Sequence, residues 1–181
     1  DKASSATIAI VHPDLVVDAV AATAGAISGT DIDVDWTVRN AGTGSTLGDW
    51  IDRVYLSTDQ TVSSDDVVLA ELANDARLNA GQSYDNSTTV TLPNGISGAY
   101  HVLVRTEAGQ VIEEGDFDAN NDGASDELAV TLAPYADLAA SNVSAQELVI
   151  GDPVDLTVAW RVDNVGTGAG LVSAWTDRVV L

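Results

Sequence analysis

The chain has 181 residues, of which 28 are acidic and 7 are basic, so its formal net charge at neutral pH is −21. Nucleic acids and anionic membranes are bound through cationic patches, and this excess of acid therefore argues against both as partners. The sequence also has no cysteine and no apolar run as long as a membrane span, so we expect neither disulfides nor direct membrane insertion.

Alternation of apolar and polar residues predicts β-strands along most of the chain. Residues 31–39 are the clearest case, because alternate residues from Ile32 to Val38 are apolar and those between them are polar. Similar patterns predict further strands at residues 14–22, 50–57, 67–72, 84–92, 99–106, 111–113, 127–132 and 155–163. Short strands separated by turns rich in Gly, Asn and Asp predict an all-β protein with an antiparallel sandwich fold.

Part of the sequence occurs twice. Residues 36–44 return at 160–168, and residues 50–56 return at 175–181 with the Trp, Asp, Arg, Val and Leu retained. A repeat of this length corresponds to a whole domain rather than to a short solenoid unit. The chain is therefore expected to contain domains in tandem.

The repeat also predicts where the domains begin and end. Residues 1–12 are expected to be the terminal strand of a preceding repeat or a linker, residues 13–134 a complete sandwich, and residues 135–181 about three strands of a second one. Neighbouring repeats of the same protein are then the expected partners. Because three strands leave an apolar face without its facing sheet, more of the chain or a like chain is expected to complete the second repeat.

Three segments carry a resemblance to a known family. They are residues 14–17, the tryptophan strand and glycine loop at 36–44, and the second tryptophan strand at 50–59. Together they are similar to the CARDB domain, the cell-adhesion-related domain found in bacteria, over residues 13–133. The resemblance implies an immunoglobulin-like β-sandwich without catalytic residues. It also implies tandem occurrence in large secreted or surface-attached prokaryotic proteins, and hence an extracellular or cell-surface location.

An acidic loop near the end of the predicted complete domain has the spacing of a calcium site. Counted from Asp118, oxygen-bearing side chains occupy positions 1, 3 and 5, and glycine follows at position 6, where the chain must turn sharply around the ion. Position 12 is Ala129 rather than glutamate, so the loop is not an EF-hand. The predicted Ca²⁺ ligands are Asp116, Asp118, Asn120, Asp122, Ala124, Asp126 and Glu127. The alternative is an acidic hairpin loop that uses Asn and Gly only for its turns.

Two other groups of carboxylates are weaker metal candidates. The loop that contains Asp59, Asp65 and Asp66 could supply a second calcium site, but it lacks alternating ligands and a central glycine, which favours a solvated loop. Asp14 and Asp137 begin the two domains, where either could join a loop of the adjacent domain in an interdomain site.

Asp52 and Arg53 follow the second tryptophan, and the same pair follows it in the second copy. A carboxylate beside a guanidinium suggests either a structural ion pair or a hydrogen-bond link to a neighbouring loop. His12 and His101 are isolated in sequence, so neither a zinc site nor a catalytic triad is predicted. The sequence thus predicts no catalytic residues.

Two functions remain open from the sequence. The first is a non-catalytic extender repeat of an extracellular prokaryotic adhesin or matrix protein, made rigid by Ca²⁺. The alternative is a carbohydrate-binding or substrate-docking module of a secreted hydrolase, which would need exposed aromatic rings. Aromatic residues are few, and Tyr55, Tyr84 and Tyr135 are the ones expected to face outward.

Overall fold

The computed structural model describes residues 10–115, 119–148, 150–170 and 174–180. The chain divides into two compact units, the first ending at Leu132 and the second beginning at Ala133.

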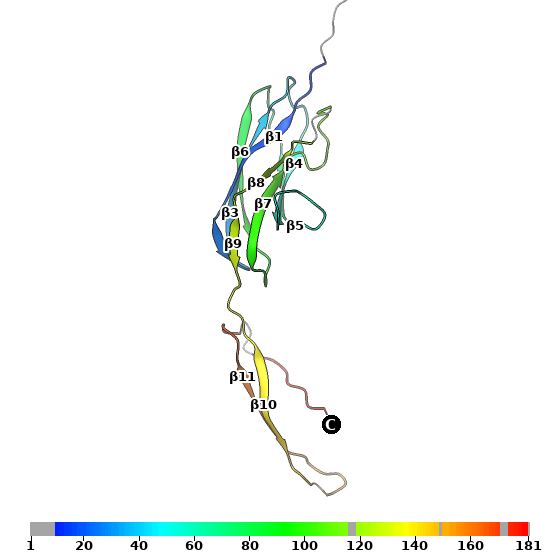
Figure 1. Ribbon diagram of the computed structural model, residues 1–181. Helices are drawn as coiled ribbons and strands as arrows, with labels where there is room; N and C mark the ends of the chain where they lie inside the picture. Colours follow the sequence, from blue (N-terminus) through cyan, green and yellow to red (C-terminus); the bar gives the residue numbers. More distant parts are fainter. Residues whose placement is uncertain (1–9, 116–118, 149, 171–173, 181) are drawn as a thin grey trace, which may run out of the picture. The chain divides into compact units, whose positions relative to one another are not determined.

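The first unit is a sandwich of two sheets (Figure 1). One sheet has the order β1-β3-β6 and is antiparallel throughout. The other has the order β2-β9-β7-β4-β5, with β8 also paired to β7, and only β2 and β9 run parallel. The strands are β1 (Leu15–Ala22), β2 (Gly25–Ile27), β3 (Asp31–Asn40), β4 (Trp50–Ser57), β5 (Val67–Asn74), β6 (Ser83–Thr91), β7 (Gly98–Arg105), β8 (Asp122–Ala124) and β9 (Leu128–Thr131). The architecture is the expected immunoglobulin-like, all-β sandwich.

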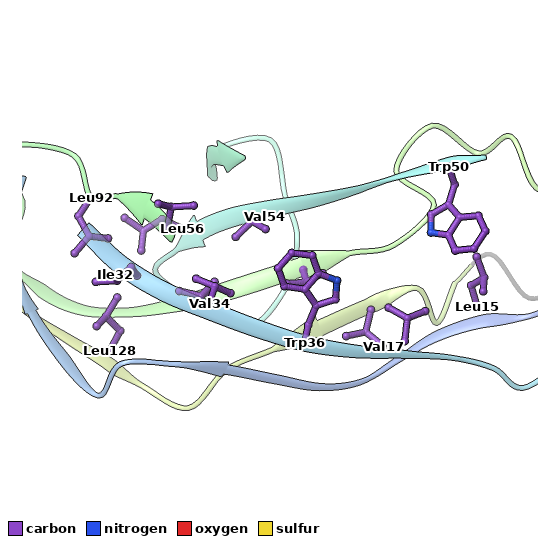
Figure 2. Close-up of a cluster of buried hydrophobic side chains, with 14 of the residues drawn as sticks. Leu15, Val17, Ile32, Val34, Trp36, Trp50, Val54, Leu56, Leu92 and Leu128 are labelled. Carbon is purple, nitrogen blue, oxygen red and sulfur yellow. The ribbon is translucent and has the colours of Figure 1, made fainter. Parts of the chain in front are cut away.

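The core lies between the two sheets and follows the alternation of β3. The inward residues of β3 from Ile32 to Val38 are almost inaccessible to solvent, whereas its outward aspartates are exposed. The inward residues pack against aliphatic residues of the other sheet, among them Val54, Leu56 and Leu128 (Figure 2). The two tryptophans at 36 and 50 are 2% exposed, so they act as core anchors rather than as surface platforms.

Most strands in the first unit lie within two residues of their predicted bounds. The strand predicted at 111–113 is wrong, because this segment has no strand pairing. Its backbone is instead bent by local bonds, in which the N–H of Ile112 donates to the side chain of Glu107 at 2.8 Å. The short strands β2 and β8 were not predicted, since three residues are too few to show a period.

The second unit contains one antiparallel pair, β10 (Leu138–Ala145) and β11 (Val158–Asn164). β11 begins three residues after the start of the predicted strand at 155–163. A third strand was expected after Trp175, but residues 174–180 form none. In the first unit the corresponding strand β4 is held between β5 and β7, and the described residues of the second unit offer no such neighbours.

The burial of Leu128 gives a direct test of the core. Leu128 is fully buried, and we expect Leu128→Ala to lower the free energy of unfolding by about 2–5 kcal/mol through lost burial and a residual cavity. The matched control is Leu47→Ala, because Leu47 is 79% exposed and its truncation should change stability by about 0.5 kcal/mol or less. Urea titrations followed by circular dichroism measure both, and equal losses would contradict the core assignment.

Candidate functional site

A buried carboxylate joins the two sheets of the first unit. Asp52 lies on β4 with no exposed surface. It accepts hydrogen bonds from the indole of Trp36 at 3.0 Å and from that of Trp50 at 3.2 Å. It also accepts from the hydroxyl of Tyr84 at 2.6 Å and that of Thr106 at 2.9 Å. Because Trp36 and Tyr84 belong to one sheet and Trp50 to the other, this network ties the sandwich across its core.

The aromatic rings of the network are packed as well as hydrogen-bonded. The rings of Trp50 and Tyr84 lie 5.9 Å apart at a tilt of 56°, and the Trp50 indole also donates to the Tyr84 hydroxyl at 3.3 Å. Figure 2 shows the side chains of Trp36 and Trp50 pointing into the core from β3 and β4. Burial, and then the negative charge of Asp52, raises the pKa of the Tyr84 hydroxyl.

Two roles were predicted for Asp52 and Arg53, and the first, an ion pair between these two side chains, is wrong. Alternate residues of a strand face opposite sides of the sheet, so Arg53 points away from Asp52. Its guanidinium instead pairs with Glu71 on β5, with Nε at 2.6 Å from the carboxylate. Hydrogen bonding is the role that Asp52 fills, although its donors lie on strands and beside β7 rather than in one neighbouring loop.

The side chain of Asn40 holds the loop that follows β3. Its Oδ1 accepts from the N–H groups of Asp14 and Gly42, both at 3.1 Å, and its Nδ2 donates to the carbonyls of Gly44 at 2.8 Å and Leu78 at 3.0 Å. Glycine is required at 42, because a Cβ there would lie 2.4 Å from the carbonyl oxygen of residue 12. We refer to these four bonds as the Asn40 clasp.

The second unit repeats much of this local structure. Asn164 Oδ1 accepts from the N–H of Asp137 at 2.9 Å and from that of Gly166 at 3.0 Å, and its Nδ2 donates to the carbonyl of Gly168 at 2.7 Å. The indole of Trp160 donates to Asp177 at 2.9 Å, as that of Trp36 does to Asp52. Three of the four bonds of the clasp and the tryptophan–aspartate bond therefore recur with the sequence motif.

The predicted calcium loop is described only in part. Asp116 and Asp118 lie outside the described residues. Asp122 and Ala124 belong to β8, and Asp122 accepts two hydrogen bonds from Arg105, both at 2.6 Å. The remaining predicted ligands lie nearby, where Asn120 donates to Asp14 at 2.9 Å and Asp126 and Glu127 are exposed.

Within the described ranges, no group of three or more His, Cys, Asp or Glu residues is placed to hold a metal ion. Asp116 and Asp118 lie outside these ranges, so the calcium loop stays a prediction. The pairing of Asp122 with Arg105 was missed because the two residues are far apart in sequence and only the pairing of β7 with β8 brings them together.

The second acidic loop is closed by its own hydrogen bonds. Asp59 accepts from the N–H of Thr61 at 2.7 Å, and Asp66 accepts from the N–H of Ser63 at 2.7 Å. Asp65 accepts from the hydroxyl of Ser63 at 2.5 Å, and this bond lowers the pKa of the Asp65 carboxyl. These are bonds of the kind that shape turns, and the second calcium site also stays a prediction.

Two buried glutamates were not singled out from the sequence. Glu114 is 1% exposed and accepts from the N–H of Leu15 at 2.7 Å and from the amide of Asn121 at 3.0 Å. Burial raises the pKa of the Glu114 carboxyl. Glu107 is also 1% exposed and accepts from the N–H of Ile112. Neither residue fits an alternating strand pattern, and their burial depends on contacts with distant segments.

The tyrosines expected to face outward do so in one case of three. Tyr55 is 6% exposed and Tyr84 is partly buried in the Asp52 network, so both expectations are wrong. Tyr135 of the second unit is 55% exposed. The first unit therefore offers neither of the two aromatic rings that a sugar-binding face was expected to use.

The sandwich has a counterpart among known domains, because residues 12–125 match the model of the CARDB family. The chain belongs to the CARDB family. CARDB domains are cell-adhesion-related structural domains, and the family is non-catalytic. No curated protein matches the chain in sequence.

Two solved CARDB structures resemble the chain. The crystal structure of the CARDB domain of the PF1109 protein from Pyrococcus furiosus, in complex with di-metal ions, is 15% identical and has a TM-score of 0.51. The match covers 70% of this chain and all of that domain. The solution structure of the same domain has the same identity and TM-score and covers 68% of this chain and all of that domain. At this identity the likeness supports the fold.

The described residues contain no helix that could cross a membrane.

The Asp52 network predicts a large loss of stability for Asp52→Asn. The amide keeps the shape of the carboxylate but replaces one acceptor with an NH₂ group that faces donors, so we expect the free energy of unfolding to fall by about 3 kcal/mol or more. The control Asp33→Asn changes an exposed carboxylate that accepts a hydrogen bond from Thr89, and about 0.5 kcal/mol or less should be lost. Urea unfolding compares the two variants, and similar losses would argue against the network.

The raised pKa of the Tyr84 hydroxyl predicts a loss of stability at alkaline pH. Its pKa is raised in the folded protein, so above about pH 10 the unfolded chain releases the phenolic proton first and unfolding becomes more favourable. The contribution of Tyr84 to the free energy of unfolding should therefore be constant below pH 10 and should fall above it, by up to about 1.4 kcal/mol per pH unit. Tyr84→Phe removes the group and should flatten this slope. An equal slope in both proteins would show that another group is responsible.

Proposed function

We propose that this chain is a non-catalytic extender segment of an extracellular prokaryotic adhesin or matrix protein, built from CARDB domains in tandem. The observation that carries the proposal is the recurrence, in a second compact unit, of three bonds of the clasp and of the tryptophan–aspartate bond of the first. A spacer between functional domains can be built from repeated structural domains. This chain belongs to a cell-adhesion-related family, and the structure at the start of its first domain occurs a second time. Its action is mechanical, because each sandwich adds length and resists unfolding.

The connection between the units supports the same proposal. Only a short segment that contains Pro134 separates the end of β9 from the start of β10. Proline restricts its own φ angle and the conformation of the residue before it, so such a linker has little conformational freedom. Successive domains of the array would then have little slack between them.

Calcium is the second part of the proposal. A chain with a net charge of −21 repels itself unless cations neutralise part of that charge. The loop from Asp116 to Glu127 supplies the oxygen ligands and the glycine turn that Ca²⁺ sites use. The related domain from Pyrococcus furiosus was solved in complex with di-metal ions, which supports a metal role in this chain as well.

The alternative, a carbohydrate-binding or substrate-docking module, has less support. Sugar sites commonly stack their ligands on exposed aromatic rings, and in the first unit Tyr55 is buried while Tyr84 is engaged by Asp52. A glycan array tests this alternative, and selective binding of one sugar class would favour it over the extender.

Removal of calcium provides the test of the proposed rigidification. We expect the melting temperature of the chain to rise by several degrees between excess EDTA and millimolar CaCl₂, because an ion that binds only the folded state stabilises it by mass action. Differential scanning calorimetry measures the shift, and millimolar MgCl₂ serves as the control for simple charge screening.

A matched pair of variants assigns the shift to the loop. Asp126→Asn removes one predicted ligand and should reduce the calcium-dependent shift, whereas Asp31→Asn removes an exposed carboxylate of β3 that lies outside the loop and should leave it intact. A melting temperature that is equal in EDTA and in calcium would remove the calcium part of the proposal and leave the extender role.

A further inference from the structure

The turn between β6 and β7 contains Asn94 and Gly95, the one place in the sequence where glycine directly follows asparagine. Both residues are exposed, and Gly95 has a φ of 76°, in the left-handed region that favours glycine. A Cβ at position 95 would meet no atom of the described residues within 4 Å, apart from its chain neighbours. Solvent therefore reaches both residues of the turn.

The two groups that can react with each other in this turn are not held by hydrogen bonds. Among the described residues, neither the carboxamide of Asn94 nor the N–H of Gly95 has a hydrogen-bond partner. The Asn94 side chain lies against the backbone of Gly29, because a Cβ at that glycine would lie 2.1 Å from Asn94 Oδ1. A reaction between the carboxamide and the backbone nitrogen thus breaks no hydrogen bond of the described protein.

The other asparagines of the described chain differ from Asn94. Side-chain hydrogen bonds are formed by those at positions 40, 74, 79, 86, 120, 121 and 164. Asn142 is exposed and forms none with the described residues, but Val143 follows it, and a β-branched side chain hinders the approach of that backbone nitrogen to the carboxamide. Asn142 is therefore the matched control within the same chain.

We propose that Asn94 is a site of spontaneous deamidation, with the backbone nitrogen of Gly95 as the nucleophile and water as the second reactant. The deprotonated nitrogen attacks Asn94 Cγ, a C–N bond forms, and the side-chain nitrogen leaves as ammonia, which closes a cyclic imide. Water then opens the imide at either of its carbonyls and leaves aspartate or isoaspartate at position 94. Overall, one amide and one water give one carboxylate and one ammonium ion, so neither an oxidant nor a reductant is needed.

The modified residue lies at the end of the first unit where β9 ends. Asn94 lies against Gly29, and the N–H of the preceding residue, Ser28, donates to the carbonyl of Thr131, the last residue of β9. Deamidation therefore adds a negative charge at this end of the sandwich, and isoaspartate also lengthens the backbone of the turn. The extender role does not depend on this reaction, so the two proposals fail separately.

The experiment follows the whole chain during incubation in neutral and in alkaline buffer. Peptide mapping by mass spectrometry measures the conversion of each asparagine. We expect position 94 to convert severalfold faster than Asn142, to yield isoaspartate as well as aspartate, and to convert faster in alkaline buffer, because the deprotonated nitrogen is the nucleophile. Equal rates at 94 and 142, or aspartate without isoaspartate, would overturn the proposal.

Two variants at position 94 complete the test. Asn94→Gln keeps the amide but would have to close a larger ring, so conversion at this position should be lost, and conversion at the wild-type rate would contradict attack by Gly95. Asn94→Asp supplies one product and serves if Asn94→Gln does not fold. Part of the aged wild type should elute with Asn94→Asp in anion exchange, and aged protein that elutes as fresh protein does would show that no charge is gained.

Discussion

The carboxylate of Asp52 is buried between the two sheets, and it has no Lys or Arg within ion-pair distance in the described part of the chain. Its charge is stabilised by four neutral donors instead, two indoles and two hydroxyls. Because these donors come from β3, β4, β6 and the residue after β7, the carboxylate can be satisfied only when both sheets are in register. Hydrophobic burial holds the sandwich together, and this network specifies how its layers align.

The entry of the chain into the sandwich is fixed from two sides. Asn40, at the end of β3, accepts from the N–H of Asp14, and Glu114 accepts from the N–H of the next residue, Leu15. Two consecutive backbone donors are thus held by side chains that are 26 and 99 positions away in sequence. The second unit repeats the asparagine half of this arrangement, at Asp137 and Asn164. The tight glycines at 42 and 166 follow from the same close approach of backbone to backbone.

Strands with several alternating residues could be predicted from the sequence, because burial of one face of a sheet imposes a period of two. β3 and β4 are examples. β2 and β8 could not be predicted, since three residues carry no period. The strand predicted at 111–113 does not form, because the N–H of Ile112 donates to the side chain of Glu107 and not to a neighbouring strand. At the candidate sites, the sequence indicated that Asp52 forms structural bonds, but its partners depend on strand pairing. The buried pair Glu107 and Glu114 shows the same limit, because nothing local marks either residue as interior.

The parallel pairing of β2 with β9 has a mechanical consequence. β2 follows directly on β1, where the chain enters the first unit, and β9 is the strand by which it leaves. A pull applied at the two ends draws these parallel strands in opposite directions along their length. The pairs from Gly25 with Ala129 to Ile27 with Thr131 are then loaded in shear, so they share the force and must yield together, whereas a hairpin pulled open from one end loses its bonds one at a time.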